Sequence, residues 1–187
     1  MAAGAYLANV DGAARGNPGP ASYGVVIRKP DGTVLESLGK RLGTQTNNVA
    51  EYHGLIAALD YAETHGIRRL RIRSDSLLLV QQMKGHYKVK NPGLKPLHER
   101  AQRMSRALEF FAIEHVPREL NSEADALANA ALDGGVGVEK SETRNSKFET
   151  RPAGARVRAR FSGGALHPRE AVALEEGDEV EITIRKL

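Results

Sequence analysis

Hydrophobic and polar positions alternate along the first third of the chain, as they do in β-strands. The alternation predicts strands over Tyr6–Val10, Tyr23–Arg28 and Val34–Leu42. Asp11-Gly12 indicates a turn after the first segment, and Pro30-Asp31-Gly32 indicates a hairpin turn before the third. We therefore expect three antiparallel strands in a meander.

After residue 46 the apolar spacing becomes helical. Leu55, Leu59 and Ala62 recur every three or four positions until Gly66, which predicts one helix. The later patterns predict a strand over Arg68–Ser74, helices over Ser76–Met83 and Leu94–Leu108, a strand over Phe110–Val116, and a helix over Ser122–Ala131 capped by Ser122. The order βββαβααβα predicts an α/β fold, a mixed five-stranded sheet flanked by helices.

The periodic pattern ends close to Asp133-Gly134-Gly135. We expect a domain over residues 1–134, a polar linker over 135–153 and a small β-rich module over 154–187. Within this module, strands are predicted over Arg156–Phe161, Ala171–Leu174 and Glu179–Ile184, with Gly163–Pro168 as a turn. A module of this size is marginal alone, so it is expected to dock or to mediate self-association.

Composition excludes several classes of protein. The 187 residues, 41% hydrophobic and 27% charged, suit one globular domain with a small appendage. The chain has no Cys, which excludes disulfides, thiolate zinc sites and a Cys nucleophile. No apolar run reaches the ~18 residues of a membrane helix, and the N-terminus has no signal-peptide pattern. We therefore expect no membrane partner and a cytoplasmic location.

Positive charge is concentrated in one stretch. The net charge of the whole chain is +4, whereas the stretch Lys84–Arg106 holds seven basic residues and one acid, Glu99. This local excess of six is compatible with a surface that binds a polyanion and equally with a solvated helix face.

Four acids stand at the ends of predicted elements. Asp11 follows the first strand, Glu51 lies in the first turn of the first long helix, Asp75 follows the fourth strand, and Asp125 lies in the first turn of the last helix. If the first and fourth strands are parallel neighbours, Asp11 and Asp75 lie side by side at their carboxyl ends. Converging carboxylates need a cation such as Mg²⁺ or Mn²⁺.

Each acid also has a purely structural interpretation. Glu51 follows Asn48 by three residues, which fits a capping arrangement, and Asp125 follows Ser122 in the same way. Asp75 could cap its own helix, and Asp11 could belong to an ordinary Asp-Gly turn. Periodicity alone does not decide whether the four acids converge.

Four motifs together resemble those of type 1 ribonucleases H. They are Val10–Pro20, Thr46–Glu51, Ile72–Ser76 and Asn121–Ala128, and they occur in the family's order and spacing between residue 1 and about residue 133. The resemblance implies the ribonuclease H fold. It also implies an endonuclease that hydrolyses the RNA strand of RNA–DNA hybrids and leaves 5′-phosphate and 3′-hydroxyl ends.

The resemblance also implies roles for individual residues. The family's metal-binding carboxylates, which hold two Mg²⁺ or Mn²⁺ ions, match Asp11, Glu51, Asp75 and Asp125. Asn17 and Asn47 match positions that contact 2′-hydroxyls of the RNA strand, Thr46 matches a phosphate contact on the DNA strand, and Ser76 falls next to a substrate-contacting position. The structural alternatives are a turn role for Asn17 and a helix cap at Asn47 or Asn48.

The loop before the last helix departs from the common family pattern. Many members carry a His there, whereas His115 ends the predicted strand and is interpreted as structural. Arg118 could replace that His by stabilising phosphate charge, and Glu119 by handling a proton or metal; we favour Arg118. The Val-Pro-Arg-Glu sequence resembles an archaeal-like subgroup. The family's basic protrusion is shortened to a loop over residues 85–94.

Two alternatives remain open. The first is another nuclease on the same fold, which would keep the carboxylates but need not keep Asn17 and Asn47. The second is a non-catalytic module that binds nucleic acid. Four intact carboxylates count against it, because their negative charges would repel a polyanion. The C-terminal segment resembles small β domains of an antitoxin-like kind.

Overall fold

A computed structural model describes residues 4–134, 159–162 and 165–168. The chain divides into two compact units, residues 1–144 and 145–187, and each unit is considered by itself. Among the described residues, no helix combines the length and the apolar character needed to cross a membrane.

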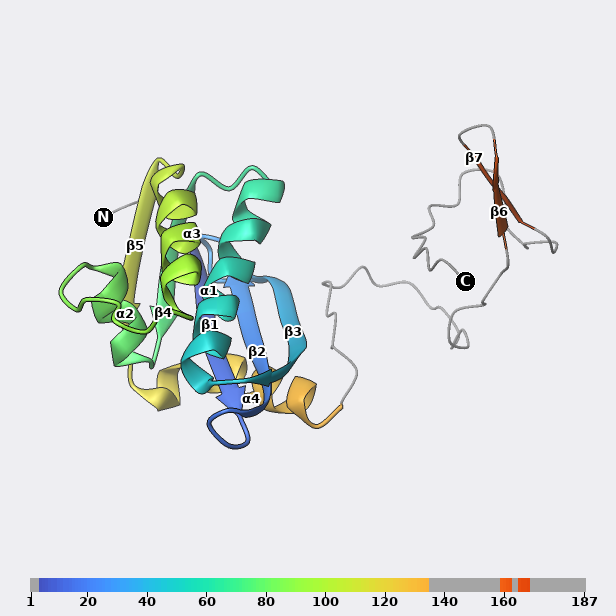
Figure 1. Cartoon of the computed structure of the whole chain (residues 1–187). Helices are drawn as coiled ribbons and strands as arrows, with labels where there is room; N and C mark the ends of the chain where they lie inside the picture. The colour runs from blue at the N-terminus through green and yellow to red at the C-terminus, as the bar shows by residue number, and fades with distance from the viewer. Residues whose placement is uncertain (1–3, 135–158, 163–164, 169–187) are drawn as a thin grey trace. The chain divides into compact units, whose positions relative to one another are not determined.

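The first unit has the predicted element order. Its elements are β1 (Tyr6–Ala14), β2 (Gly19–Arg28), β3 (Val34–Gln45), α1 (Asn47–Thr64), β4 (Arg69–Ser74), α2 (Leu77–Met83), α3 (Lys95–Arg106), β5 (Phe110–His115), the 3₁₀ turn η1 (Arg118–Leu120) and α4 (Ser122–Leu132). The five strands form one sheet in the order β3-β2-β1-β4-β5 (Figure 1). β1, β2 and β3 pair antiparallel, and β4 pairs parallel with β1 and β5. The predicted mixed five-stranded fold is confirmed.

The first two strands are longer than their apolar alternation predicts. β1 and β2 remain paired as far as Ala14 and Ala21, so Asp11 and Gly12 lie inside β1, opposite Gly24 and Tyr23. The prediction of a turn at Asp11-Gly12 is therefore wrong. The backbone ladder holds these residues extended, and a ladder depends on the partner strand rather than on local side-chain preference.

The two faces of the sheet carry different helices. Side chains that alternate along β1 and β2, such as Val10, Val25 and Ile27, are fully buried with Leu55 and Leu59 of α1 in the main core. Residues from α2 and α3 join the same core, so α1, α2 and α3 cover this face (Figure 1). α4 covers the other face over β1, β2 and β3.

α4 lies unusually close to the sheet. A Cβ atom on Gly24 would stand 2.1 Å from the carbonyl oxygen of Ala124, so only glycine permits this approach. The buried Ser22 hydroxyl donates to the carbonyl of Ala128 at 2.5 Å. Ala124 and Ala128 are themselves fully buried, and this small-residue contact determines where the first turn of α4 lies.

The second unit contributes one described hairpin. β6 (Ala159–Ser162) pairs antiparallel with β7 (Ala165–Pro168). β6 overlaps the predicted strand Arg156–Phe161. The interpretation of Gly163–Pro168 as a turn is wrong from Ala165 onward, because Ala165 pairs with Ser162 and belongs to the ladder. The predicted strands Ala171–Leu174 and Glu179–Ile184 lie outside the described residues.

Candidate active site

Three of the four predicted acids meet at one edge of the sheet. Asp11 lies in β1, Glu51 in α1, and Asp75 directly after β4, and one carboxylate oxygen from each lies within 4.8 Å of the other two. The parallel pairing of β1 with β4, which extends to Asn9 and Arg73, brings Asp11 and Asp75 to neighbouring positions. Asp11 and Glu51 are only 4% and 5% exposed.

Glu51 reaches the cluster because α1 approaches β1 closely at Gly12. A Cβ atom on Gly12 would lie 2.4 Å from the backbone nitrogen of Glu51, so no larger residue fits without a shift of the helix. Glu51 lies in the second turn of α1, not in the first as predicted. The reason is that Thr46 caps this helix, accepting the Val49 N–H at 3.3 Å, and the predicted cap at Asn47 or Asn48 is wrong.

Asp125 lines the same cavity from the first turn of α4. The cavity has a volume of about 240 Å³. Its lining consists of the four acids Asp11, Glu51, Asp75 and Asp125, together with Gly12, Ala13, Ala14, Asn47, Arg118 and Asn129. The N-cap position of α4 is Asn121 rather than Ser122, and no side chain makes a capping hydrogen bond there. The capping interpretation of this motif is therefore wrong.

The cluster carries more negative charge than the protein compensates. Burial, together with the charges of Asp75 and Asp125, raises the pKa of Asp11 to about 7. Burial also raises the pKa of Glu51 well above its usual range, with added repulsion from Asp11 and Asp75. Glu51 Oε2 is buried without a hydrogen-bond partner. Clustered carboxylate oxygens with an unsatisfied buried atom fit a hard divalent cation.

The two asparagines implied in RNA contact lie together beside the cavity. Asn17, in the exposed connection between β1 and β2, accepts the backbone N–H of Asn47 at 3.3 Å through Oδ1. Asn47 also approaches Glu51, with its Nδ2 3.5 Å from Oε1. Asn47 itself lines the cavity, so its amide lies within reach of a group bound there.

The other two implied substrate residues are helix caps. Ser76 caps α2 by accepting the Leu79 N–H at 3.4 Å, as Thr46 caps α1. Asp75 is therefore not the cap of α2, and that structural interpretation is wrong. Both hydroxyls lie at helix N-termini, where backbone N–H groups also favour an anionic group such as phosphate.

The connection between β5 and α4 brings one charged side chain to the site. Arg118 in η1 lines the cavity and donates to Asp125 Oδ1 at 2.6 Å, although its side chain is 72% exposed. Glu119 does not line the cavity. His115 ends β5, with Nε2 3.2 Å from the backbone carbonyl of Asp75. This contact agrees with its structural interpretation.

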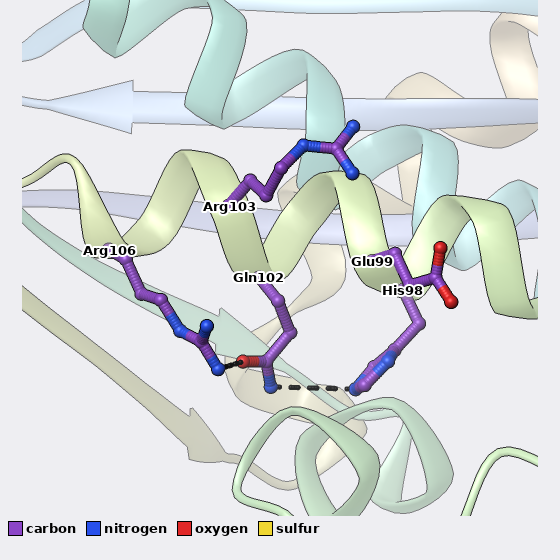
Figure 2. A pocket seen from close by; sticks show the side chains of 5 residues that line it. All are labelled: His98, Glu99, Gln102, Arg103 and Arg106. Atoms are coloured by element: carbon purple, nitrogen blue, oxygen red, sulfur yellow. Dashed lines mark hydrogen bonds between the residues drawn. The ribbon is translucent and has the colours of Figure 1, made fainter.

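A larger pocket lies along α3, away from the acids. It has a volume of about 470 Å³ and is lined by His98, Glu99, Gln102, Arg103 and Arg106 (Figure 2). Gln102 donates to the carbonyl of Met83 and lies beside His98, whose ring contacts the carbonyl of Gln82. These contacts join α3 to α2. A pocket with one acid and no buried charge is a poorer candidate for catalysis than the smaller carboxylate cavity.

The basic stretch forms an exposed surface on α3 and the loop before it. All seven basic residues between Lys84 and Arg106 are exposed. Arg100 pairs with Asp60 at 2.9 Å, while the other six make no ion pair with any described residue. No helix forms between Met83 and Lys95, as the shortened loop predicts.

Asn121 begins the motif Asn121–Ala128, but its sequence context indicated no role in the site. Asn121 is 1% exposed, and its side chain contacts Asp75 directly. Its place in the chain, just before a helix, is typical of an ordinary cap. Only its burial beside the carboxylate of Asp75 distinguishes Asn121 from such a cap.

Comparison with protein families identifies two matching segments. Residues 9–131 match a family model described as reverse transcriptase-like, and residues 154–187 match one described as AF2212-like. The first match contains all four acids and both asparagines.

Similar proteins match the first unit. Ribonuclease HI of Halobacterium salinarum is 44% identical over 66% of this chain and 62% of its own length. A bifunctional protein of Mycobacterium tuberculosis is 48% identical over 66% of this chain. The chain spans 34% of the length of that mycobacterial relative.

Solved structures match the same region. The crystal structure of RNase H1 from Halobacterium salinarum superposes with a TM-score of 0.68 at 43% identity, covering 70% of this chain and 99% of that one. LC11-RNase H1 in complex with an RNA/DNA hybrid superposes with a TM-score of 0.66 at 40% identity, with the same coverage of both chains.

Proposed function

The chain belongs to the type 1 ribonuclease H family, and on that premise we propose that its first unit cuts the RNA strand of RNA–DNA hybrids. The single observation that carries this proposal is the cavity at the sheet edge, where Asp11, Glu51 and Asp75 approach within 4.8 Å of one another and Asp125 completes the lining. A structure 40% identical to this chain is described as a complex with an RNA/DNA hybrid, which supports the choice of substrate.

The proposed cofactors are two Mg²⁺ or Mn²⁺ ions held by the four carboxylates. The fit rests on the unpaired, buried Glu51 Oε2 and on the raised pKa values of Asp11 and Glu51. Two bound divalent cations supply an activated water on one side of phosphorus and stabilise the leaving oxygen on the other. This chemistry would give 5′-phosphate and 3′-hydroxyl products.

The protein's own residues would position the strand. Arg118, highly exposed beside Asp125, would stabilise the negative charge of the phosphate. Asn17 and Asn47 would donate to 2′-hydroxyls, which only RNA carries, and so select the strand that is cut. Thr46, Ser76 and the exposed basic surface of α3 would hold phosphates, without reading sequence.

The C-terminal segment enters the proposal only as a separate module. We assign residues 1–134 to the catalytic domain, 135–153 to a linker and 154–187 to the module. The AF2212-like match over residues 154–187 supports the last of these assignments. The described residues contain nothing that supports self-association.

The test is cleavage of an end-labelled RNA strand, alone or paired with DNA or RNA, with Mg²⁺, Mn²⁺ or EDTA. We expect metal-dependent cutting confined to RNA in the hybrid, resolved as a ladder on a denaturing gel. Binding of the hybrid without cutting in either metal would contradict the proposal and favour a non-catalytic module. Cutting of the RNA strand alone or in duplex RNA as fast as in the hybrid would favour another nuclease on this fold.

Strand selection gives a second prediction. Asn47→Ala is expected to lower kcat/KM for cutting RNA in a hybrid, relative to RNA alone or in duplex RNA, by about fivefold to tenfold. This is the effect expected from loss of one hydrogen bond to the substrate. Asn48→Ala is the matched control, because Asn48 is the next residue of the same helix but does not line the cavity. An unchanged preference in the Asn47 variant would exclude its 2′-hydroxyl role.

A further inference from the structure

Asn121 is the centre of a small buried polar network behind the carboxylates. Its Nδ2 donates to the carbonyl oxygen of Val10 at 2.9 Å and to Asp75 Oδ1 at 3.1 Å. Its Oδ1 accepts from Asn9 Nδ2 at 3.1 Å, and the same Asn9 amide donates to the carbonyl of Leu120 at 3.1 Å. Both N–H donors and the oxygen of the Asn121 side chain are therefore used.

The same residue is connected to three of the four acids. Its side chain contacts Asp75 itself, and it contacts Val10, the residue before Asp11. Its backbone carbonyl accepts the N–H of Asp125 at 3.1 Å, in the first turn of α4. One residue thus links the end of β4, the middle of β1 and the start of α4, the elements that carry these acids.

A capping role does not account for Asn121. Asparagine at an N-cap ordinarily accepts a backbone N–H from the first turn of its helix. Here α4 has no side-chain cap, and the Asn121 side chain points to β1 and Asp75 instead. Aspartate could not donate to Val10 or Asp75, and an aliphatic side chain would leave the carbonyl of Val10 unpaired in the interior.

We propose that Asn121 is a positioning residue that holds Asp75 and the first turn of α4 in the arrangement needed to bind divalent cations. The inference rests on the proposed function, because it concerns the same carboxylates. The Asn121 amide orients one oxygen of Asp75 and leaves the other free for a cation. Partners that orient a metal ligand in this way affect metal affinity or activity by about 10-fold to 100-fold.

The test uses the full chain with Asn121→Ala and a matched control, Ser22→Ala. Ser22 is also fully buried and also fastens α4 to the sheet, through its bond to Ala128, but it does not line the cavity. Mn²⁺ alone is titrated into each protein by calorimetry. The kcat and KM for the hybrid, and the thermal unfolding temperature, are measured in parallel.

For Asn121→Ala we expect the Mn²⁺ dissociation constant to rise at least about tenfold, and kcat at low metal to fall equally, with KM for the hybrid nearly unchanged. Ser22→Ala should lose stability but keep wild-type Mn²⁺ affinity. Equal Mn²⁺ affinities in the two variants would overturn the proposal, because Asn121 would then be merely structural.

A second variant covers the case in which Asn121→Ala does not fold. Asn9→Ala removes the bond that orients the Asn121 amide but leaves the donor to Asp75 in place. It should weaken Mn²⁺ binding in the same direction by a smaller factor, and unchanged affinity would overturn the proposal. Failure of the wild-type protein to bind Mn²⁺ or to cut the hybrid would contradict the proposed function instead, so the two failures are distinguishable.

Discussion

Asp11→Asn is expected to reduce hybrid cleavage by on the order of a thousandfold or more, with the fold retained. Asp11 is 4% exposed and belongs to the cluster with Glu51 and Asp75. Asparagine keeps the shape of the side chain but removes one anionic ligand from the site that would bind cations. The measurement is kcat/KM for the labelled hybrid in Mg²⁺, together with circular dichroism and thermal unfolding.

The matched control for this variant is Asp31→Asn. Asp31 lies in the turn between β2 and β3, where its Oδ1 accepts the Thr33 N–H at 2.9 Å, a bond that asparagine can also accept. This control should retain full activity. If Asp11→Asn kept more than a tenth of wild-type activity, or if its inactivity came with unfolding, the catalytic assignment of Asp11 would be wrong.

The second large effect is a dependence of stability on pH and metal that Asp11 controls. Folding raises the pKa of Asp11 from 3.8 to about 7 through burial and the nearby carboxylates, and it raises that of Glu51 in the same direction. Between about pH 4 and about pH 7, the native state therefore binds more protons than the unfolded state. The free energy of unfolding of the metal-free protein therefore falls, through these groups, as pH rises from about 4 to about 7.

Other groups act in the opposite sense, so the comparison must be made between variants. Burial lowers the pKa of His53 in the folded state below its ordinary value of 6.5. The unfolded state therefore binds more protons there, and the free energy of unfolding falls as pH drops below that value. The hydrogen bonds from Arg73 and Arg71, together with their positive charges, lower the pKa of Glu114 despite its partial burial, which favours the folded state above the unfolded pKa. The difference between wild type and Asp11→Asn removes these shared contributions.

In EDTA, Asp11→Asn is expected to unfold at a higher temperature than wild type at pH 8, with the difference disappearing near pH 4. The raised pKa of Asp11 corresponds to a difference in the free energy of unfolding of a few kcal/mol at most. Mg²⁺ should raise the unfolding temperature of wild type at pH 8 but have little effect on the variant, because a ligand stabilises only the state that binds it. Differential scanning calorimetry across this pH range checks both expectations. A pH-independent difference would contradict them.

The local pattern of apolar and polar residues was sufficient to predict the order and type of the helices and strands. Alternation over Val34–Leu42 and helical spacing through Leu55, Leu59 and Ala62 depend on residues a few positions apart, and these correspond to β3 and α1. The motifs around Asp11, Glu51, Asp75 and Asp125 likewise identified the acids that line one cavity. These features could be predicted because their signals are contained within short segments.

The remaining features depend on contacts between distant segments. Pairing with β2 extends β1 through Asp11 and Gly12, and the close approach of α1 at Gly12 brings Glu51 to Asp11. The role of Asn121 was invisible in sequence, because an asparagine before a helix resembles a cap until β1 and Asp75 are seen to surround it. The order of the elements and the identity of the candidate acids could thus be predicted from the amino-acid pattern. The strand ends, the burial that raises the pKa values of Asp11 and Glu51, and the partners of Asn121 required the folded structure, because each depends on groups far away along the chain.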